Sequence, residues 1–253
     1  MSEHYQRIAI ITGATSGIGE ATARAFLEDG FGVLGNGRNE ARLKELEKEF
    51  GKAFCGVAGD AADEQVIDSL FPAAEEHFGR PADTVIANAG RGLGGTVSTV
   101  DMEEFREVLN INVTGTLYLL KKAAEHLVAL QDDAYPDSAA DIVILGSTVG
   151  RHISPFSTAY GSTKFAVHAL AEGLRREIGP KGVRVTLVEP GIVISKFQET
   201  AGYTHELVKN FHLKFGPLLY GYDVADAIHF VVTRPPHVHI GDFVIRATRQ
   251  DYP

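Results

Sequence analysis

The sequence has one cysteine, no tryptophan and no long apolar run among its 253 residues. Its single cysteine, Cys55, cannot form an internal disulfide, and its apolar neighbours favour a buried, reduced thiol over a nucleophile. No stretch approaches the roughly eighteen consecutive apolar residues that a membrane-spanning helix needs. The segment Met1 to Arg7 lacks the charged-then-apolar layout of a secretory signal. We therefore expect a cytoplasmic protein with no membrane partner.

Basic residues are also few compared with acidic ones. The 24 Lys and Arg residues against 33 Asp and Glu residues leave a formal net charge of -9. A nucleic-acid surface would need clustered basic residues, so we expect no nucleic-acid partner. His237 and His239 alternate as on a strand, but no third ligand has a fitting spacing, and we expect no metal site. The remaining composition is typical of a globular protein, which we expect to form one domain over residues 1–253.

Short apolar runs rich in β-branched residues alternate with longer amphipathic runs along the chain. The pattern predicts strands at residues 8–11, 32–34, 53–57, 84–87, 142–145, 183–188 and 243–245. It predicts helices at residues 18–27, 40–49, 63–78, 102–109, 113–130, 158–178 and 224–232. Most of the strands are apolar on both sides, as in parallel sheets covered by helices on both faces. We therefore expect an α/β protein with a doubly wound parallel sheet of about seven strands.

A glycine-rich segment, Thr12-Gly-Ala-Thr-Ser-Gly-Ile-Gly19, directly follows the first predicted strand and opens a predicted helix. Glycines let the backbone turn tightly and approach a phosphate, while the helix N-terminus offers free N–H groups. At this position a phosphate-binding loop is favoured over a glycine turn without a ligand. The candidate cofactor-binding residues of this loop are Gly13, Thr15, Ser16, Gly17, Ile18 and Gly19.

Tyr160 and Lys164 stand one helical turn apart, thirteen or more residues after Ser147, which closes an apolar run. Side chains at this spacing project from the same face of a helix. A cation about 4 Å from the phenol is worth about 4 kcal/mol at an effective dielectric of about 20, so we expect a tyrosine pKa lowered by about three units. Tyr118 and Lys122 have the same spacing but follow no strand that ends in serine.

These motifs, with Asn88-Ala-Gly90 and Pro190-Gly191 after later strands, occur in an order that resembles the short-chain dehydrogenase/reductase family in its shorter single-domain form. The resemblance covers essentially the whole chain and implies a Rossmann-like fold. It implies that Tyr160 is the general acid-base and that Lys164 supports it and holds the nicotinamide ribose. It further implies that Ser147 donates a hydrogen bond to the substrate oxygen. Asn112 matches the fourth catalytic position, where a helix distortion holds a water linked to the lysine.

The resemblance also implies the remaining contacts to a nicotinamide cofactor. Asp60 matches the contact to the adenine ring, and Asn88 matches the residue that ties the central strands together. Gly90 would let the ribose approach. The other residues implied to bind the cofactor are Ala89, Pro190, Gly191, Val193 and Ser195.

The end of the second predicted strand decides between the two nicotinamide cofactors. An acidic residue there would bind the adenine ribose hydroxyls of NAD and repel the extra phosphate of NADP. This chain has Gly37 at that position, and Arg38 beside it can make a bidentate contact with a phosphate. Together with Asn36, Arg38 favours NADP(H) over NAD(H).

The substrate is less defined by the sequence. In this family, a segment that corresponds to about residues 196–222 forms a lid, and here it is rich in aromatic residues: Phe197, Tyr203, Phe211, Phe215, Tyr220 and Tyr222. Two interpretations stay open, a moderately apolar ligand and ordinary packing of a helical flap. Charged residues near the motifs are candidates for holding a carboxylate, or are solvated loop charges: Arg91, Arg151, His152 and Lys196. The C-terminal segment 237–250 resembles a branch that includes dehydrogenases of serine and other 3-hydroxy acids.

We therefore expect an NADP(H)-dependent carbonyl reductase or alcohol dehydrogenase acting on a small or medium alcohol or ketone, including the possibility of a 3-hydroxy acid. The alternative is a catalytically inactive nucleotide-sensing or scaffold protein on the same fold. Small residues on the predicted helix 158–178 would allow a partner helix to approach closely, so we expect a homo-oligomer, a tetramer or a dimer. These small residues are Ala166, Ala169, Ala171 and Gly173.

Overall fold

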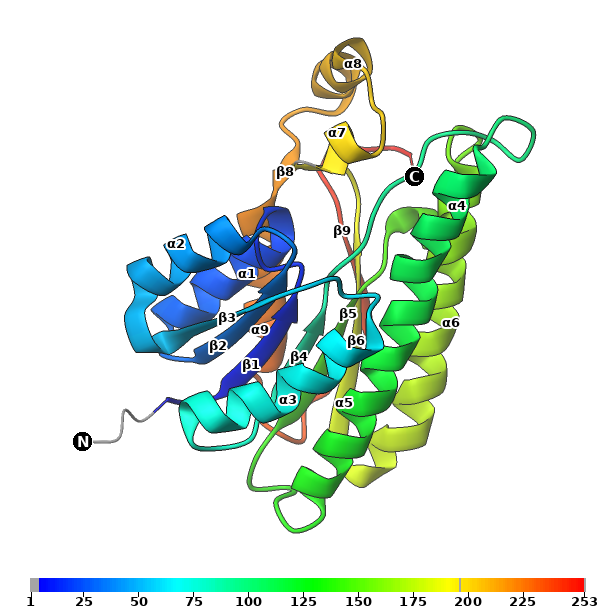
Figure 1. Ribbon diagram of the computed structural model, residues 1–253. Helices are drawn as coiled ribbons and strands as arrows, with labels where there is room; N and C mark the ends of the chain where they lie inside the picture. Colours follow the sequence, from blue (N-terminus) through cyan, green and yellow to red (C-terminus); the bar gives the residue numbers. More distant parts are fainter. Residues whose placement is uncertain (1–4, 196, 253) are drawn as a thin grey trace.

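Seven parallel strands form one sheet in the order β3-β2-β1-β4-β5-β6-β9 (Figure 1). The computed structural model describes residues 5–195 and 197–252. The strands are β1 (Ile8–Thr12), β2 (Gly32–Gly37), β3 (Phe54–Ala58), β4 (Thr84–Ala87), β5 (Ala140–Leu145), β6 (Val183–Pro190) and β9 (Asp242–Ile245). Each predicted strand is confirmed. The strand order reverses direction between β1 and β4, which creates a switch point where ligands bind in folds of this type.

Helices cover both faces of the sheet. One face packs against α3 (Glu64–Phe78), α5 (Thr116–Gln131) and α6 (Thr158–Ile178). The other packs against α1 (Gly17–Glu28), α2 (Glu40–Phe50) and α9 (Gly221–Val232). In β1, Ile8 and Ile10 point into the first layer, while Ala9 and Ile11 point into the second, because side chains alternate along a strand. This burial on both sides explains the nearly continuous apolar strands in the sequence.

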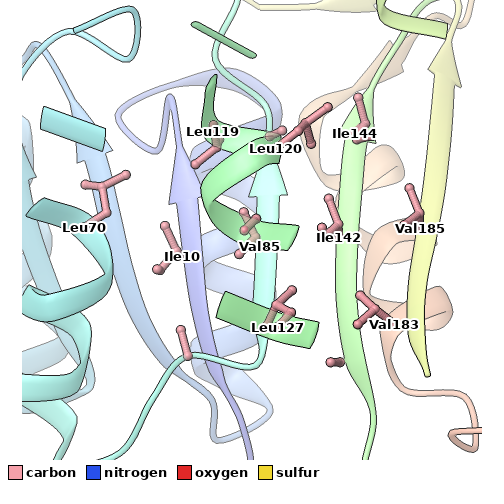
Figure 2. Packing of buried hydrophobic residues seen from close by; sticks show 14 of the residues in the cluster. Ile10, Leu70, Val85, Leu119, Leu120, Leu127, Ile142, Ile144, Val183 and Val185 are labelled. Carbon is pink, nitrogen blue, oxygen red and sulfur yellow. The ribbon is translucent and has the colours of Figure 1, made fainter. Parts of the chain in front are cut away.

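Figure 2 shows the packing of the first layer from close by. Ile10, Val85 and Ile142 stand on neighbouring parallel strands, and Leu120 and Leu127 of α5 lie over them. All five side chains have at most 2% of their surface exposed. The sheet and this helix are therefore joined by a dense apolar contact.

One helix departs from regular geometry just before α5. The chain is helical from α4 (Met102–Leu109) through a π-helical segment, Asn110–Gly115, into α5. The wide turn lies against the loop after β3, where a Cβ on Gly115 would lie 2.7 Å from the Ala61 carbonyl oxygen. Because the π segment adds a residue to the turn, it rotates the buried Asn112 side chain relative to a regular helix. The predicted helix 113–130 therefore starts at residue 116 and is preceded by this distortion.

The segment between β6 and α9 contains elements that the sequence pattern did not predict. It holds β7 (Val193–Ile194), α7 (Phe197–Thr200), α8 (His205–Phe215) and β8 (Leu219–Tyr220). The two short strands pair in parallel as a separate sheet. In Figure 1, α7 and α8 lie beyond the carboxyl ends of the large sheet. Strands of two residues have no periodicity for a sequence to reveal.

A buried ion cluster joins the opposite, amino ends of the strands. Arg7 binds Asp83 at 2.8 Å and Asp141 at 2.7 Å, and Arg184 binds Asp141 at 2.7 Å. Both arginines also donate to the Val232 carbonyl at the end of α9, each at 2.9 Å. Asp141 is 1% exposed and Arg184 5%. The cluster connects β1, β4, β5, β6 and α9, and each charge is paired, as buried charges must be.

Among residues 5–195 and 197–252, no helix is long and apolar enough to cross a membrane. In the same residues, no three His, Cys, Asp or Glu side chains gather where they would hold a metal ion. Cys55 is only partly buried, and burial together with Glu47 raises its thiol pKa, which disfavours the reactive thiolate.

We predict that Asp141→Ala lowers the free energy of unfolding by about 3 to 5 kcal/mol, because it leaves Arg7 and Arg184 buried without their shared carboxylate. Urea denaturation followed by circular dichroism measures this loss. Glu40→Ala is the control, because the Glu40–Lys44 pair is exposed and its removal should have no measurable effect. Equal stabilities of the two variants would contradict a role for the cluster.

Candidate functional site

The carboxyl ends of the central strands open into one cleft of about 910 Å³. The glycine loop, the end of β2, the segments after β4, β5 and β6, and the inner side of α7 and α8 line this cleft. Every predicted catalytic and cofactor-binding residue lines it except Gly19 and Asn112. These two lie directly behind residues that do, so the structure brings the whole predicted set together.

The glycine loop has a backbone that only glycine adopts readily. Gly13 and Gly17 have φ angles of 69° and 55°, in the left-handed region. A Cβ on Gly19 would lie 2.3 Å from the Gly13 carbonyl oxygen, so the loop can fold against α1 only if this residue is glycine. Within the described chain, the Ser16 side chain makes no capping bond to α1, and residues 16–18 line the cleft. Their free N–H groups fit an anion such as a diphosphate.

Asn88 ties the two central strands together where the strand order reverses. Its Nδ2 donates to the Thr12 carbonyl at 2.9 Å and to the Gly13 carbonyl at 3.3 Å. The Thr12 hydroxyl in turn accepts from the backbone N–H groups of Asn88 and Ala89, at 3.2 and 3.1 Å. This double link joins the end of β1 to the segment after β4.

Ser147, Tyr160 and Lys164 meet at the floor of the cleft. Ser147 follows β5, and its Oγ accepts a hydrogen bond from the Val149 N–H at 3.3 Å. Tyr160 is 7% exposed on the first turn of α6, and its ring packs edge-on against Phe197, with the centroids 5.7 Å apart. The Lys164 ammonium donates to the Leu145 carbonyl at 2.8 Å and lies 6.0 Å from the centre of the Tyr160 ring.

Burial dominates the ionisation of this pair. It raises the pKa of Tyr160, Tyr203 raises it further, and a hydrogen bond with Ser147 acts in the opposite direction. Burial also lowers the pKa of Lys164 to about 8. The sequence-based expectation that Lys164 lowers the tyrosine pKa is therefore wrong for this structure. The ammonium donates to the Leu145 carbonyl, and desolvation of the buried phenol is the largest influence on the Tyr160 pKa.

Asn112 connects two segments of the cleft. Its Oδ1 accepts from the Arg91 N–H at 2.8 Å, and its Nδ2 donates to the Arg91 carbonyl at 2.9 Å. The same Nδ2 donates to the Thr163 hydroxyl on α6 at 3.1 Å. The amide thus holds the segment after β4 against α6 beside Lys164. It stands on a distorted stretch of helix, as the family resemblance implied.

The end of β2 carries an unpaired cation. Arg38 is exposed at the edge of the cleft and, among the described residues, has no ion pair, whereas the neighbouring Arg42 is bound by Glu20 and Glu45. A Cβ on Gly37 would lie 2.6 Å from the Thr15 methyl group, so an acidic side chain does not fit there.

Asn36 lies beside this cation and is fully buried. Its Nδ2 donates to the Val57 carbonyl, and its Oδ1 has no partner within the described chain. An unpaired buried oxygen costs free energy until a donor reaches it. The end of β2 therefore suits a group that combines hydroxyl donors with a phosphate.

The loop after β3 and the segment after β6 complete the cleft. Asp60 accepts from the Ala62 N–H at 2.9 Å and lines the cleft with its exposed carboxylate. Ser195 lies against the glycine loop, because a Cβ on Gly17 would lie 3.3 Å from the Ser195 Cβ. Pro190, Gly191 and Val193 line the wall between these points.

Two glutamines that no motif marks hold this wall in place. Gln198 donates to the Val193 carbonyl at 2.6 Å and accepts from the Ser195 N–H at 2.9 Å. Gln250 accepts from the Ile192 N–H at 3.0 Å, and a Cβ on Gly191 would lie 2.4 Å from it. Both side chains are at most 7% exposed. No local pattern in the sequence reveals that the C-terminal segment returns to the cleft.

The structure separates the charged residues that were candidates for holding a carboxylate. Arg151 is bound by Glu189 and Asp242, and His152 is exposed and does not line the cleft. Arg91 lines the cleft, but its guanidinium binds Glu107 at 2.5 Å. Lys196 lies outside the described residues.

The second tyrosine-lysine pair lies away from the cleft. Tyr118 and Lys122 stand on α5 and both contact Asp68 of α3, with Lys122 at 2.8 Å and the Tyr118 hydroxyl at 3.1 Å. Neither residue lines the cleft. The position in the fold therefore distinguishes two pairs that share the same spacing.

Comparison with known proteins gives consistent results. A model of the short chain dehydrogenase family matches residues 7–205. A serine 3-dehydrogenase from Agrobacterium fabrum is 32% identical over 247 residues, which are 96% of this chain and 94% of the relative. A closed form of serine dehydrogenase complexed with NADP+ superposes with a TM-score of 0.87 at 28% identity, covering 97% of this chain and 96% of that one.

A 3-ketoacyl-(acyl-carrier-protein) reductase from Brucella melitensis, complexed with NADH, has a TM-score of 0.85 at 26% identity. The match covers 97% of this chain and 98% of the reductase. The same architecture thus occurs with either nicotinamide cofactor in solved structures.

We predict that Lys164→Met stabilises the cofactor-free protein at pH 7. The lysine pKa falls from its usual 10.5 to about 8 in the folded chain. Each pKa unit of this lowering costs the wild type about 1.4 kcal/mol, and the lost hydrogen bond costs the variant about 1 kcal/mol. The free energy of unfolding of the variant should therefore be higher by about 1 to 3 kcal/mol.

The pKa of Lys164 is lower in the folded than in the unfolded chain. The loss of stability in the wild type is therefore complete below pH 8 and disappears as the pH rises toward 10.5. The advantage of the methionine should therefore be largest at pH 7 and small at pH 10 in urea denaturation. A variant less stable than the wild type at pH 7 would contradict the strong desolvation of the ammonium.

Proposed function

The chain belongs to the short-chain dehydrogenase family of oxidoreductases, and from this we propose that it is an NADP(H)-dependent dehydrogenase or reductase that interconverts an alcohol and a carbonyl group. One observation carries the proposal. Ser147, Tyr160 and Lys164 meet at the floor of a cleft whose other end is the glycine loop. A protein that only senses a nucleotide needs the loop but not the tyrosine.

Tyr160 is the proposed general acid-base. Bound NADP(H) would supply the hydride to the substrate carbon in reduction, or receive it in oxidation. The Tyr160 hydroxyl would give its proton to the carbonyl oxygen in reduction, and the Tyr160 phenolate would take a proton from the alcohol in oxidation. Because burial raises the pKa of Tyr160, the hydroxyl stays protonated at neutral pH, ready for the reductive direction.

Ser147 and Lys164 support this step. The Ser147 Oγ accepts from the Val149 N–H, and we propose that the Ser147 hydroxyl donates its own proton to the carbonyl oxygen, where negative charge develops. Lys164 is proposed to hold the nicotinamide ribose hydroxyls. Asn112 is proposed to act beside it by holding the segment after β4 against α6.

The residues at the end of β2 support NADP(H) as the cofactor. The solved relatives include a serine dehydrogenase with NADP+ and a reductase with NADH, so the fold alone does not decide. Here Arg38, which forms no ion pair with any residue that the structure describes, can bind the extra phosphate, and Thr15 fills the space that an acidic residue at position 37 would need. The further proposed contacts are Gly13, Ser16, Gly17, Ile18 and Gly19 for the diphosphate, Asn36, Asp60, Ala89 and Gly90 for the adenosine half, and Pro190, Gly191, Val193 and Ser195 for the nicotinamide half.

The cleft above Tyr160 supports a medium-sized substrate with an apolar body. Residues 197–222 are the proposed lid, and aromatic side chains from the lid and from the turn before α6 line this part of the cleft: Phe156, Phe197, Tyr203, Phe211 and Phe215. Phe156 is 78% exposed, so it is available to cover a ligand. The serine 3-dehydrogenase relative makes a 3-hydroxy acid the second candidate. For its carboxylate we propose Lys214 at the rim of the cleft, whose ammonium lies 3.5 Å from the exposed Asp251 carboxylate.

Two finer expectations remain proposals. We keep the proposal of a homo-oligomer, for which Ala169 and Gly173 are exposed small residues on α6. Ala171 is only 3% exposed and packs in the core, so it is withdrawn from the proposed contact. We also keep a cytoplasmic location and a single domain.

The function is tested by following NADPH consumption with aromatic ketones and medium-chain aldehydes, and NADP+ reduction with serine and 3-hydroxybutyrate. We predict turnover of at least one class. Tyr160→Phe should lower kcat by about 100-fold to 10,000-fold, because it removes the proton donor. Tyr118→Phe is the matched control and should keep full activity. Tight NADPH binding without turnover across the panel would instead favour a nucleotide sensor.

The cofactor preference is tested by fluorescence titration of the free protein. We predict that Arg38→Ala raises the Kd for NADPH about 10-fold to 100-fold, through the loss of about 1.5 to 3 kcal/mol of charged hydrogen bonding. The Kd for NADH should change little. Arg42→Ala serves as the control, because Glu20 and Glu45 already neutralise that guanidinium. A wild type that binds NADH more tightly than NADPH would refute the proposal.

A further inference from the structure

A partly buried histidine contacts the turn that carries Ser147. His168 lies on α6 one helical turn after Lys164, and its side chain is 13% exposed. The backbone N–H of Ser147 donates to His168 Nε2 at 3.3 Å. A Cβ on Gly146 would lie 2.5 Å from this nitrogen, and a Cβ on Gly150 2.3 Å from it. The imidazole is therefore enclosed by the two glycines that flank the Ser147 turn.

The hydrogen bond determines the state of the ring. A nitrogen that accepts from an N–H group carries no proton, so His168 must be neutral with its proton on Nδ1. Nδ1 faces the Glu189 carboxylate, with 3.8 Å between Nδ1 and Oε2. This distance exceeds that of a hydrogen bond but favours the tautomer that points its proton at the carboxylate.

Charged residues surround the ring from each element packed against it. Glu189, on β6, is fully buried and is held by Arg151 at 2.5 Å and 2.6 Å. Arg151 follows the Ser147 turn and also binds Asp242 on β9. Lys164 lies on the same helix as His168.

These groups act on the His168 pKa in both directions. Burial lowers it, Lys164 and Arg151 lower it further, and Glu189 and Asp242 raise it, with a net lowering. The neutral ring is therefore the form present at neutral pH.

We propose that neutral His168 is a positioning residue that holds Ser147 at the substrate oxygen, and that its protonation in acid releases the Ser147 turn. The inference rests on the proposed function of Ser147. A proton on Nε2 would face the Ser147 N–H, so donor would meet donor and the bond would be lost. The ion pair between Arg151 and Glu189 still holds the end of the turn when His168 is protonated. We therefore expect Ser147 itself to move.

Nuclear magnetic resonance tests the contact without any substrate. In protein labelled with 15N-serine and with 13C,15N-histidine, the Ser147 amide is the serine signal lost in Ser147→Ala. We expect the Nδ1–H tautomer of His168 at pH 8. We also expect the Ser147 amide shift to move with the same midpoint as the imidazole when the pH is lowered. The Nε2–H tautomer at pH 8, or an amide that ignores the titration of the ring, would overturn the proposal.

Variants test the consequence for catalysis on a ketone that the wild type reduces. His168→Leu removes the acceptor and should lower kcat at least 10-fold at pH 8, with less than 3-fold change in the Kd for NADPH. His168→Gln offers an amide oxygen in place of Nε2 and should restore most of kcat, without the acidic limb that the wild type shows. His126→Gln is the matched control, because His126 bonds the Ala82 carbonyl at the opposite end of the sheet.

An acidic limb that persists unchanged in His168→Gln, or full activity in His168→Leu, would refute the positioning role. The two lines of evidence also separate this inference from the proposed function. If no ketone is reduced, the proposed function fails, while the amide titration still decides whether His168 holds Ser147.

Discussion

The burial of both faces of the sheet is the constraint on which the rest of the molecule depends. Because helices cover each face, most strand side chains must be apolar, and polar chemistry is concentrated at the two ends of the strands. At the amino ends, Arg7, Asp141 and Arg184 satisfy one another in a closed cluster. At the carboxyl ends, the glycine loop and the residues after β4, β5 and β6 open into the cleft. One end therefore stabilises the fold while the other is free for chemistry.

The same burial sets the ionisation of the proposed catalytic pair. Burial is the largest influence on both groups: it raises the pKa of the Tyr160 phenol and lowers the pKa of the Lys164 ammonium. The result is a protonated tyrosine and a lysine whose ammonium donates to the Leu145 carbonyl. The buried ammonium destabilises the ligand-free protein. Such an arrangement suits a site in which a bound ligand supplies the further hydrogen-bond partners.

The sequence predicted the features that are local in the chain. The seven strands follow from apolar runs, and the glycine loop, Ser147, Tyr160 and Lys164 follow from spacing and order. It did not predict α7, α8, Gln198, Gln250 or His168, because their meaning depends on contacts between distant segments. The prediction of a lowered tyrosine pKa was wrong for the same reason. The spacing of Tyr160 and Lys164 in the sequence says nothing about how much water reaches them in the fold. Periodicity reports local structure, whereas desolvation is a property of the complete fold.

The close approach of His168 to Gly146 and Gly150 has a consequence for how this chain can change over generations. No side chain can be added at either glycine while the imidazole occupies the space between them. Substitutions at these three positions therefore depend on one another. A smaller residue at position 168 must come first, and only then can alanine be accepted at 146 or 150. Lineages that have passed through that step would carry a different support for the serine turn, and their tolerance of acid would have diverged with it.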